Sequence, residues 1–137
     1  MKILVIAPHP DDETLGCGGT LFRHAQEEDE IFWLIVTSIS AERGWSDITV
    51  NKRAEEIANV ANKYRFSEVF ELQFPTTKLD TLPHSDLINK VGEVYKKVKP
   101  EIIYMPFSKD VHTDHQLTAQ AIQSTIKWFR YPYIKKV

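Results

Sequence analysis

Cysteine, long hydrophobic runs and clusters of basic residues are all scarce in this sequence. Cys17 is the only cysteine among 137 residues, which excludes an internal disulfide and a thiolate cluster for zinc. The apolar runs at residues 3–7 and 31–36 are far shorter than the ~20 residues of a membrane-spanning helix, and the first is too short for the core of a signal peptide. We therefore expect a soluble, cytoplasmic protein with no membrane partner.

The charges are nearly balanced, with 17 Lys and Arg against 19 Asp and Glu and a formal net charge of -2. No stretch of Lys or Arg is long enough to form the electrostatic footprint of a nucleic-acid binder, so nucleic acid is not an expected partner. A length of 137 residues is near the commonest size of a single domain and is large enough to bury a core. The sequence therefore predicts one domain over residues 1–137.

Short apolar runs alternate with longer segments of helical period along the chain. The runs are rich in β-branched or aromatic residues and continuous, as in parallel strands covered on both faces. The pattern predicts strands over residues 3–7, 31–36, 69–72 and 102–105, and helices over 15–28, 54–64, 87–98 and 113–128. Right-handed crossovers then give a Rossmann-like α/β fold, an open and mostly parallel sheet with helices on both faces. Irregular segments at 38–49 and 73–85 follow strands, where active-site loops of such sheets lie.

The stretch His9-Pro10-Asp11-Asp12-Glu13 follows the first predicted strand directly. Ligands bind open α/β sheets beyond the carboxyl ends of the strands, where this stretch is expected to lie. Imidazole and carboxylate groups suit zinc or another divalent first-row metal. His9 and one aspartate can bind the ion while the other aspartate takes a proton from its water. The alternative is that the three acids only stabilise the start of the next helix, at ~0.3–1 kcal/mol each.

A second polar cluster, His112-Thr113-Asp114-His115, lies between the last predicted strand and the last predicted helix. Helical spacing makes His112 and His115 near neighbours, so one can complete the metal shell while the other faces a substrate. Without the first cluster, the simpler interpretation of this pair is that the two histidines are solvated or cap the helix. Together with the first cluster it favours a metal site with its own general base, and hence hydrolysis. His24 and His84 have no acidic doublet beside them, and we assign them no chemistry.

The two clusters, with Ala7 and the stretch 16–20, resemble the paired signature of the PIG-L/LmbE-like zinc-dependent N-deacetylases, and the resemblance spans nearly the whole chain. The resemblance implies zinc bound by His9, Asp12 and His115. It also implies an N-acetyl amino sugar, or a conjugate of one, as the small-molecule substrate.

Further roles follow from the same resemblance. Asp11 corresponds to the general base and His112 to the group that steadies the oxyanion. Arg53 corresponds to an arginine that contacts substrate, and Asp80 to a substrate-binding acid. The alternative for Arg53 is a surface arginine paired with Glu56 or its neighbour.

The chain also departs from this family. It is shorter than the usual member, so the resemblance implies a domain truncated at its C-terminus. Residues 128–137 are dense in aromatics and predict a helix end followed by the start of a strand. An unpaired strand favours association with another chain, so we expect either a truncated member or a homo-oligomer. The segment 40–44 follows the family's Gly/Glu-rich loop only loosely.

Three rival functions stay open. A dinucleotide-binding module is disfavoured because Leu21 stands where the fingerprint that begins at Gly16 needs glycine. A truncated, catalytically weak protein that binds metal and a sugar or another partner is the main alternative to a deacetylase. A metal-dependent phosphatase is weaker still, although carboxylates and histidines also serve phosphoryl chemistry.

Overall fold

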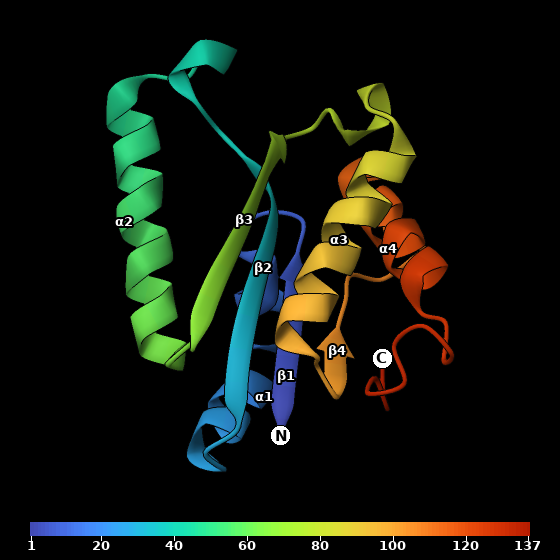
Figure 1. Cartoon of the computed structure of the whole chain (residues 1–137). Coiled ribbons are helices and arrows are strands. Elements are labelled where there is room, and N and C mark those ends of the chain that lie inside the picture. Colours follow the sequence, from blue (N-terminus) through green and yellow to red (C-terminus); the bar gives the residue numbers. More distant parts are fainter.

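The structure is a computed structural model that describes all of residues 1–137. It contains one parallel four-stranded sheet between two layers of helices (Figure 1). The strands lie in the order β3–β2–β1–β4, so β1 pairs with both β2 and β4. This order confirms the predicted α/β fold and sets the carboxyl ends of β1 and β4 side by side. The elements are β1 (Lys2–Ala7), α1 (Asp12–Gln26), β2 (Glu30–Ser38), η1 (Ala41–Arg43), α2 (Asp47–Tyr64), β3 (Glu68–Pro75), η2 (Leu79–Thr81), α3 (His84–Val98), β4 (Ile102–Tyr104) and α4 (Thr113–Thr125).

The two central strands are buried on both faces, which explains their continuous apolar sequences. On one face, Leu4 and Leu34 belong to a core cluster with α3 and α4. On the other, Val5 and Trp33 belong to a second cluster with residues of α1 and α2. The sheet thus lies between two separate apolar layers, and its polar functional groups are confined to its ends.

Three helices begin earlier than the apolar period predicts, because their first turns are polar. Helix α1 begins at Asp12, α2 at Asp47 and α3 at His84. The Oγ of Ser46 accepts a hydrogen bond of 3.1 Å from the N–H of Thr49 and so caps α2. The predicted loop 38–49 therefore ends before α2, and the predicted loop 73–85 is shortened at both ends by β3 and α3. None of the helices is long and apolar enough to cross a lipid bilayer.

The C-terminal segment folds back onto its own sheet. Helix α4 ends at Thr125, and Lys136 then forms a single parallel bridge with Ile102. The N–H of Ile103 donates to the carbonyl oxygen of Lys136 at 3.0 Å, and the buried Tyr131 ring packs edge-on against Tyr95. At this bridge the segment pairs with β4 of the same chain. Oligomerisation stays a prediction.

Close packing of α1 against α2 depends on Gly18. A Cβ at this position would lie 2.6 Å from the hydroxyl oxygen of Tyr64, nearer than ordinary contacts allow. Helix α1 also departs from helical geometry at the preceding residue, Cys17, where φ is -145° and ψ is 21°. The first turn of α1, which contains Asp12 and Glu13 of the His9 stretch, is therefore set apart by a kink from the rest of the helix.

Candidate metal centre

The two predicted clusters meet at the carboxyl end of the sheet. His9 follows β1 and His115 lies in the first turn of α4, which follows β4 along the chain. Their ring nitrogens, His9 Nδ1 and His115 Nε2, lie 3.3 Å apart although the residues are separated by 106 positions. The pairing of β1 with β4 is what brings the two segments together.

Asp12 completes a group of three ligand atoms. Its Oδ2 lies 3.4 Å from His9 Nδ1 and 3.2 Å from His115 Nε2. A tetrahedral zinc ion with bonds of about 2.0–2.1 Å keeps its ligand atoms about 3.3 Å apart. The residues therefore fit zinc both in their chemistry and in the spacing of their donor atoms. Between 15% and 20% of each side chain is exposed, so the site is open to a substrate.

Both histidine rings are oriented by carboxylates behind them. The Nε2–H of His9 donates to Asp114 at 2.9 Å, and the Nδ1–H of His115 donates to Asp110 at 3.1 Å. A carboxylate only accepts, so each ring carries its proton on the far nitrogen and directs a lone pair toward Asp12. Two lone pairs and a carboxylate oxygen converging at these distances form a cation site.

Asp114 is the most buried carboxylate of the site, with 1% of its side chain exposed. It also accepts hydrogen bonds from the N–H groups of Thr77 at 2.7 Å and Leu79 at 3.3 Å. Thr77 has a left-handed backbone, with φ of 61°. Strain of this kind is found at functional sites, and here it aims a backbone donor at the carboxylate that orients His9.

Hydrogen bonding and burial act on the pKa values of the ligands. Burial lowers the pKa of His9, but its hydrogen bonds with Asp12 and Asp114 outweigh this and raise the pKa above its ordinary value. Burial raises the pKa of Asp12, but hydrogen bonds with His9 outweigh it and leave this pKa lowered. The pKa of Asp110 is lowered first by the hydrogen bond from the N–H of His112. Both shifts favour the ionised forms of Asp12 and Asp110.

Asp11 differs from Asp12 in being unpaired. Asp12 accepts the N–H of His9 at 2.8 Å, whereas the carboxylate of the exposed Asp11 forms no hydrogen bond or ion pair. Asp11 is the N-cap residue of α1 by position, yet its side chain caps no N–H group. The alternative that these acids cap the helix is therefore not supported by a capping hydrogen bond. Asp11 therefore carries a carboxylate with no partner in the chain, one residue before Asp12.

His112 caps α4 and thereby has a fixed orientation. Its Nδ1 accepts the N–H of Asp114 at 3.1 Å, and its ring lies 4.7 Å from that of His9 and 5.0 Å from that of His115. Accepting at Nδ1 requires the proton of a neutral ring to be on Nε2, which leaves an N–H donor. His9, His112 and Asp114 form a second group of the right composition for a metal. In this group, His9 Nε2 and His112 Nδ1 are already engaged in hydrogen bonds with Asp114, so we favour the first group.

The structure also places the two residues expected to bind substrate. Arg53, on α2, lines a hollow together with Pro10 of the His9 stretch. Its Nε also lies 3.4 Å from Glu56, so the expected surface pair is present as well. Asp80 is exposed on η2, next to Leu79, whose N–H reaches Asp114. Both residues border the site, and their roles stay predictions.

Three acids near the site received no role from the sequence. Asp110 and Asp114 lie within or beside the second cluster, but their hydrogen bonds to His115 and His9 arise only on folding. Glu13 is 2% exposed; its Oε1 accepts the hydroxyl of Thr14 at 2.6 Å and its Oε2 has no partner. Burial raises the pKa of Glu13. In the sequence, only the position of Glu13 within the His9 stretch indicated that it lies near the site.

His24 forms a separate polar cluster away from the predicted site. Its Nδ1 pairs with Asp29 at 2.7 Å and its Nε2 with the hydroxyl of Tyr104 at 2.9 Å. Both ring nitrogens are thus engaged within the protein.

Known proteins resemble this chain in both sequence and fold. The PIG-L family, described as GlcNAc-PI de-N-acetylase, matches residues 4–126. The diacetylchitobiose deacetylase of Thermococcus kodakarensis is 30% identical over 125 residues, which covers 84% of this chain and 45% of that protein. The chain thus spans less than half the length of this relative.

Two solved structures share the fold. The N,N′-diacetylchitobiose deacetylase from Pyrococcus horikoshii has a TM-score of 0.78 at 22% identity, covering 98% of this chain and 52% of that one. The 4-carboxy-2-hydroxymuconate hydratase from Pseudomonas putida KT2440 has a TM-score of 0.74 at 21% identity, covering 90% of this chain and 55% of that one. One fold therefore carries two different reactions, so the reaction must be argued from the site. The family match covers most of the sequence and includes both polar clusters, and the chain belongs to the PIG-L family.

Proposed function

We propose that this chain is a zinc-dependent hydrolase that removes an N-acetyl group from an amino-sugar-containing substrate. The observation that carries the proposal is the convergence of His9 Nδ1, Asp12 Oδ2 and His115 Nε2 at 3.2–3.4 Å. The unpaired Asp11 directly precedes the ligand Asp12 in the sequence. Membership of the PIG-L family and the likeness to a deacetylase support amide hydrolysis over other water-based reactions. Another divalent first-row metal would fit the same donors.

When bound, zinc lowers the pKa of a coordinated water to about 7 and polarises the amide carbonyl. Asp11 is then the general base, because its carboxylate has no internal partner. It accepts a proton from water as the new C–O bond forms. It returns that proton to the nitrogen as the C–N bond breaks, giving acetate and a free amine.

His112 has the complementary role of hydrogen-bond donor. The Asp114 N–H occupies its Nδ1, so a neutral ring presents Nε2–H to the oxygen that gains negative charge during attack. His112 therefore stabilises the oxyanion as a hydrogen-bond donor.

We assign Arg53 and Asp80 to substrate binding. Arg53 lines the hollow that Pro10 links to the His9 stretch, and Asp80 lies on the η2 turn beside Leu79. Both carry groups that bond sugar hydroxyls. The Thermococcus relative is a diacetylchitobiose deacetylase, so N,N′-diacetylchitobiose is the first substrate to test.

The deciding experiment measures acetate release from N,N′-diacetylchitobiose and N-acetylglucosamine by zinc-loaded protein. We expect turnover that a chelator abolishes and zinc restores. Asp11→Asn should keep zinc and lose ~10²–10⁴-fold in kcat, because only the proton transfer is removed. Unchanged kcat in this variant contradicts the assignment of the base.

The same assay separates the enzyme from the alternative of a metal-containing protein that binds a sugar or another partner without turnover. Such a protein would bind the sugars but release no acetate, with or without zinc. The extent of the deacetylase domain over residues 1–137 and a cytoplasmic location stay predictions.

A further inference from the structure

A hydrogen-bonded turn after α4 carries two large apolar side chains at its tip. The N–H of Arg130 donates to the carbonyl oxygen of Lys127 at 2.8 Å, so Trp128 and Phe129 are the two central residues of this turn. Central turn residues are usually Gly, Pro, Asn, Asp or Ser, and the turn itself does not require aromatic ones. Trp128 is nevertheless 83% exposed and Phe129 64% exposed. Adjacent exposed aromatic side chains of this size indicate an interaction surface.

The turn has a fixed place on the body of the protein. Tyr131 follows it and is buried, and a Cβ at Gly92 of α3 would lie only 2.8 Å from the Tyr131 hydroxyl oxygen. The hydroxyl of Tyr133 donates to the carbonyl oxygen of Tyr95 at 2.9 Å. The turn is therefore anchored on its C-terminal side, and it presents the two exposed rings together at one point of the surface.

The charged residues around this tip are all positive. The segment 126–137 contains Lys127, Arg130, Lys135 and Lys136 and no acid, although the whole chain has a net charge of -2. Lys135 pairs with Glu101, whereas the other three form no ion pair. Lys96 of α3, also without an ion pair, lines a small cleft together with Arg130. The turn patch is defined by Lys96, Lys127, Trp128, Phe129, Arg130 and Lys136.

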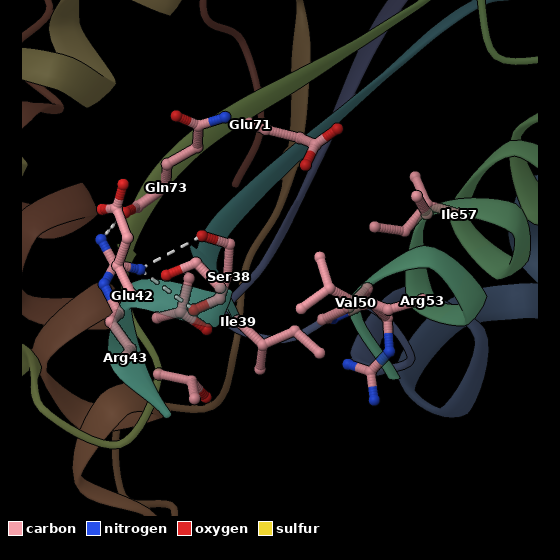
Figure 2. Close-up of a pocket in the computed structure, with 14 residues that line it drawn as sticks. Ser38, Ile39, Glu42, Arg43, Val50, Arg53, Ile57, Glu71 and Gln73 are labelled. Carbon is pink, nitrogen blue, oxygen red and sulfur yellow. Dashed lines mark hydrogen bonds between the residues drawn. The ribbon is translucent and has the colours of Figure 1, made fainter. Parts of the chain in front are cut away.

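The turn patch lies at the opposite end of the sheet from the metal centre. Helix α4 contains His115 in its first turn and runs for 13 residues, or ~20 Å, before the chain reaches the patch. Lys136 bridges Ile102, the first residue of β4, at the amino ends of the strands (Figure 1). The hollow that Arg53 lines is also remote, because it lies at the carboxyl ends of β2 and β3 (Figure 2). The proposed function therefore leaves the turn patch unexplained.

We propose that the turn patch binds the surface of an anionic lipid membrane, with the side chains of Trp128 and Phe129 among the headgroups. Tryptophan is favoured at this interface, where its ring lies in apolar surroundings and its N–H reaches water. The cations around the two rings are attracted to anionic headgroups. Surface binding needs no membrane-spanning segment. It thus differs from the expectation of no membrane partner, which rests on the lack of such a segment.

Two other occupants fit these features less well. A second copy of this chain, paired through the same patch, would bring like charges together, which is unfavourable. Single-stranded nucleic acid stacks successive bases on aromatic side chains. The rings of Trp128 and Phe129 are nearly perpendicular, at 89°, and form no parallel platform for two bases. The charge and the ring geometry therefore favour a lipid surface.

The test is flotation of the full chain with phosphatidylcholine vesicles that contain or lack phosphatidylglycerol. We expect binding to the anionic vesicles only, and weaker binding as the NaCl concentration rises. Trp128→Ser should weaken binding about tenfold, because the ring no longer leaves water. Arg130→Gln should weaken it about fivefold, through the loss of one cation near the surface. The matched controls are Ile48→Ser and Lys52→Gln, at exposed positions of α2, and they should leave binding unchanged.

Equal binding to neutral and anionic vesicles, or binding to neither, would overturn the proposal. A loss in Trp128→Ser no greater than in Ile48→Ser would also overturn it, as would equal effects of Arg130→Gln and Lys52→Gln. Binding to a single-stranded oligonucleotide but not to vesicles would overturn it in favour of nucleic acid. None of these measurements depends on acetate release, so the proposed function is tested separately.

Discussion

The imidazole of His9 is held by the buried carboxylate of Asp114, 2.9 Å from its Nε2. This bond places the proton on Nε2 and leaves Nδ1 free to bind a metal. Asp114→Asn removes the charged acceptor, and we expect the affinity for zinc to fall ~10–100-fold, as for other residues that orient a metal-binding histidine. Competition with a chromophoric chelator measures this affinity. Asp86→Asn, at an exposed position of α3, is the control, and a similar loss in both variants would contradict the orienting role.

His112 combines a structural and a chemical role that two substitutions separate. Its Nδ1 caps α4 by accepting the N–H of Asp114, and asparagine is also a good N-cap. His112→Asn should keep the stability but lose ~10²–10³-fold in kcat with the oxyanion donor. His112→Ala should lose the same activity and, in addition, ~1 kcal/mol of unfolding free energy. Thermal unfolding and acetate release measure the two effects, and full activity of His112→Asn would contradict the donor role.

The zinc-free protein should have a stability maximum in mildly acidic solution. The pKa of His9 is raised on folding, so its contribution is present below its unfolded pKa of about 6.5 and is lost as pH rises through the folded value. The pKa of Asp12 is lowered, so its contribution is present above about 3.9 and is lost as pH falls. Urea midpoints should therefore decrease from pH 6.5 to 8.5, and the decrease should shrink in His9→Asn.

Zinc should reverse this trend. Binding requires neutral imidazoles, so the ion stabilises the protein more as pH rises from 6 to 8. At a zinc concentration 100 times Kd, the gain is about 2.7 kcal/mol. A zinc-free midpoint that rises with pH, or a midpoint unaffected by zinc at pH 8, would be inconsistent with the ligand group.

The contact between α1 and α2 provides a test of packing. Gly18→Ala would place a Cβ 2.6 Å from the Tyr64 hydroxyl, and we expect a loss of ~1–3 kcal/mol of unfolding free energy. Tyr64→Phe removes that hydroxyl, and the next ring atom would be 3.6 Å from the new Cβ. The double variant should therefore regain much of the stability in urea unfolding. If the losses of unfolding free energy in the two single variants add up in the double variant, the contact with the Tyr64 hydroxyl is not what excludes a larger residue at position 18.

Much of the fold could be predicted from the sequence because it depends on local patterns, whereas the choice of His9, Asp12 and His115 within the two clusters came from the family resemblance. The apolar run before His9 predicts a buried strand, and parallel strands have their carboxyl ends at one edge. The meeting of His9 with His115 therefore follows from topology. The first turns of α1, α2 and α3 could not be predicted, because their side chains are polar and show no apolar helical period.

The finer parts of the site depend on tertiary contacts that no periodic pattern in the sequence indicates. The hydrogen bonds from His9 to Asp114 and from His115 to Asp110 appear only when β4 and α4 are in place. Arg53 lies near Glu56 and also lines the hollow next to Pro10. Neither its sequence context nor its position therefore decides between a surface ion pair and substrate binding.

The most direct test is a crystal structure of the zinc-loaded protein, with the ion located by anomalous scattering at the zinc edge. We predict one ion bound by His9 Nδ1, Asp12 and His115 Nε2 at about 2.0–2.2 Å, with Asp11 and His112 next to its open side. An ion held instead by His112 and Asp114, or no ion at the carboxyl end of β1 despite zinc in solution, would contradict the metal centre and the hydrolysis that depends on it.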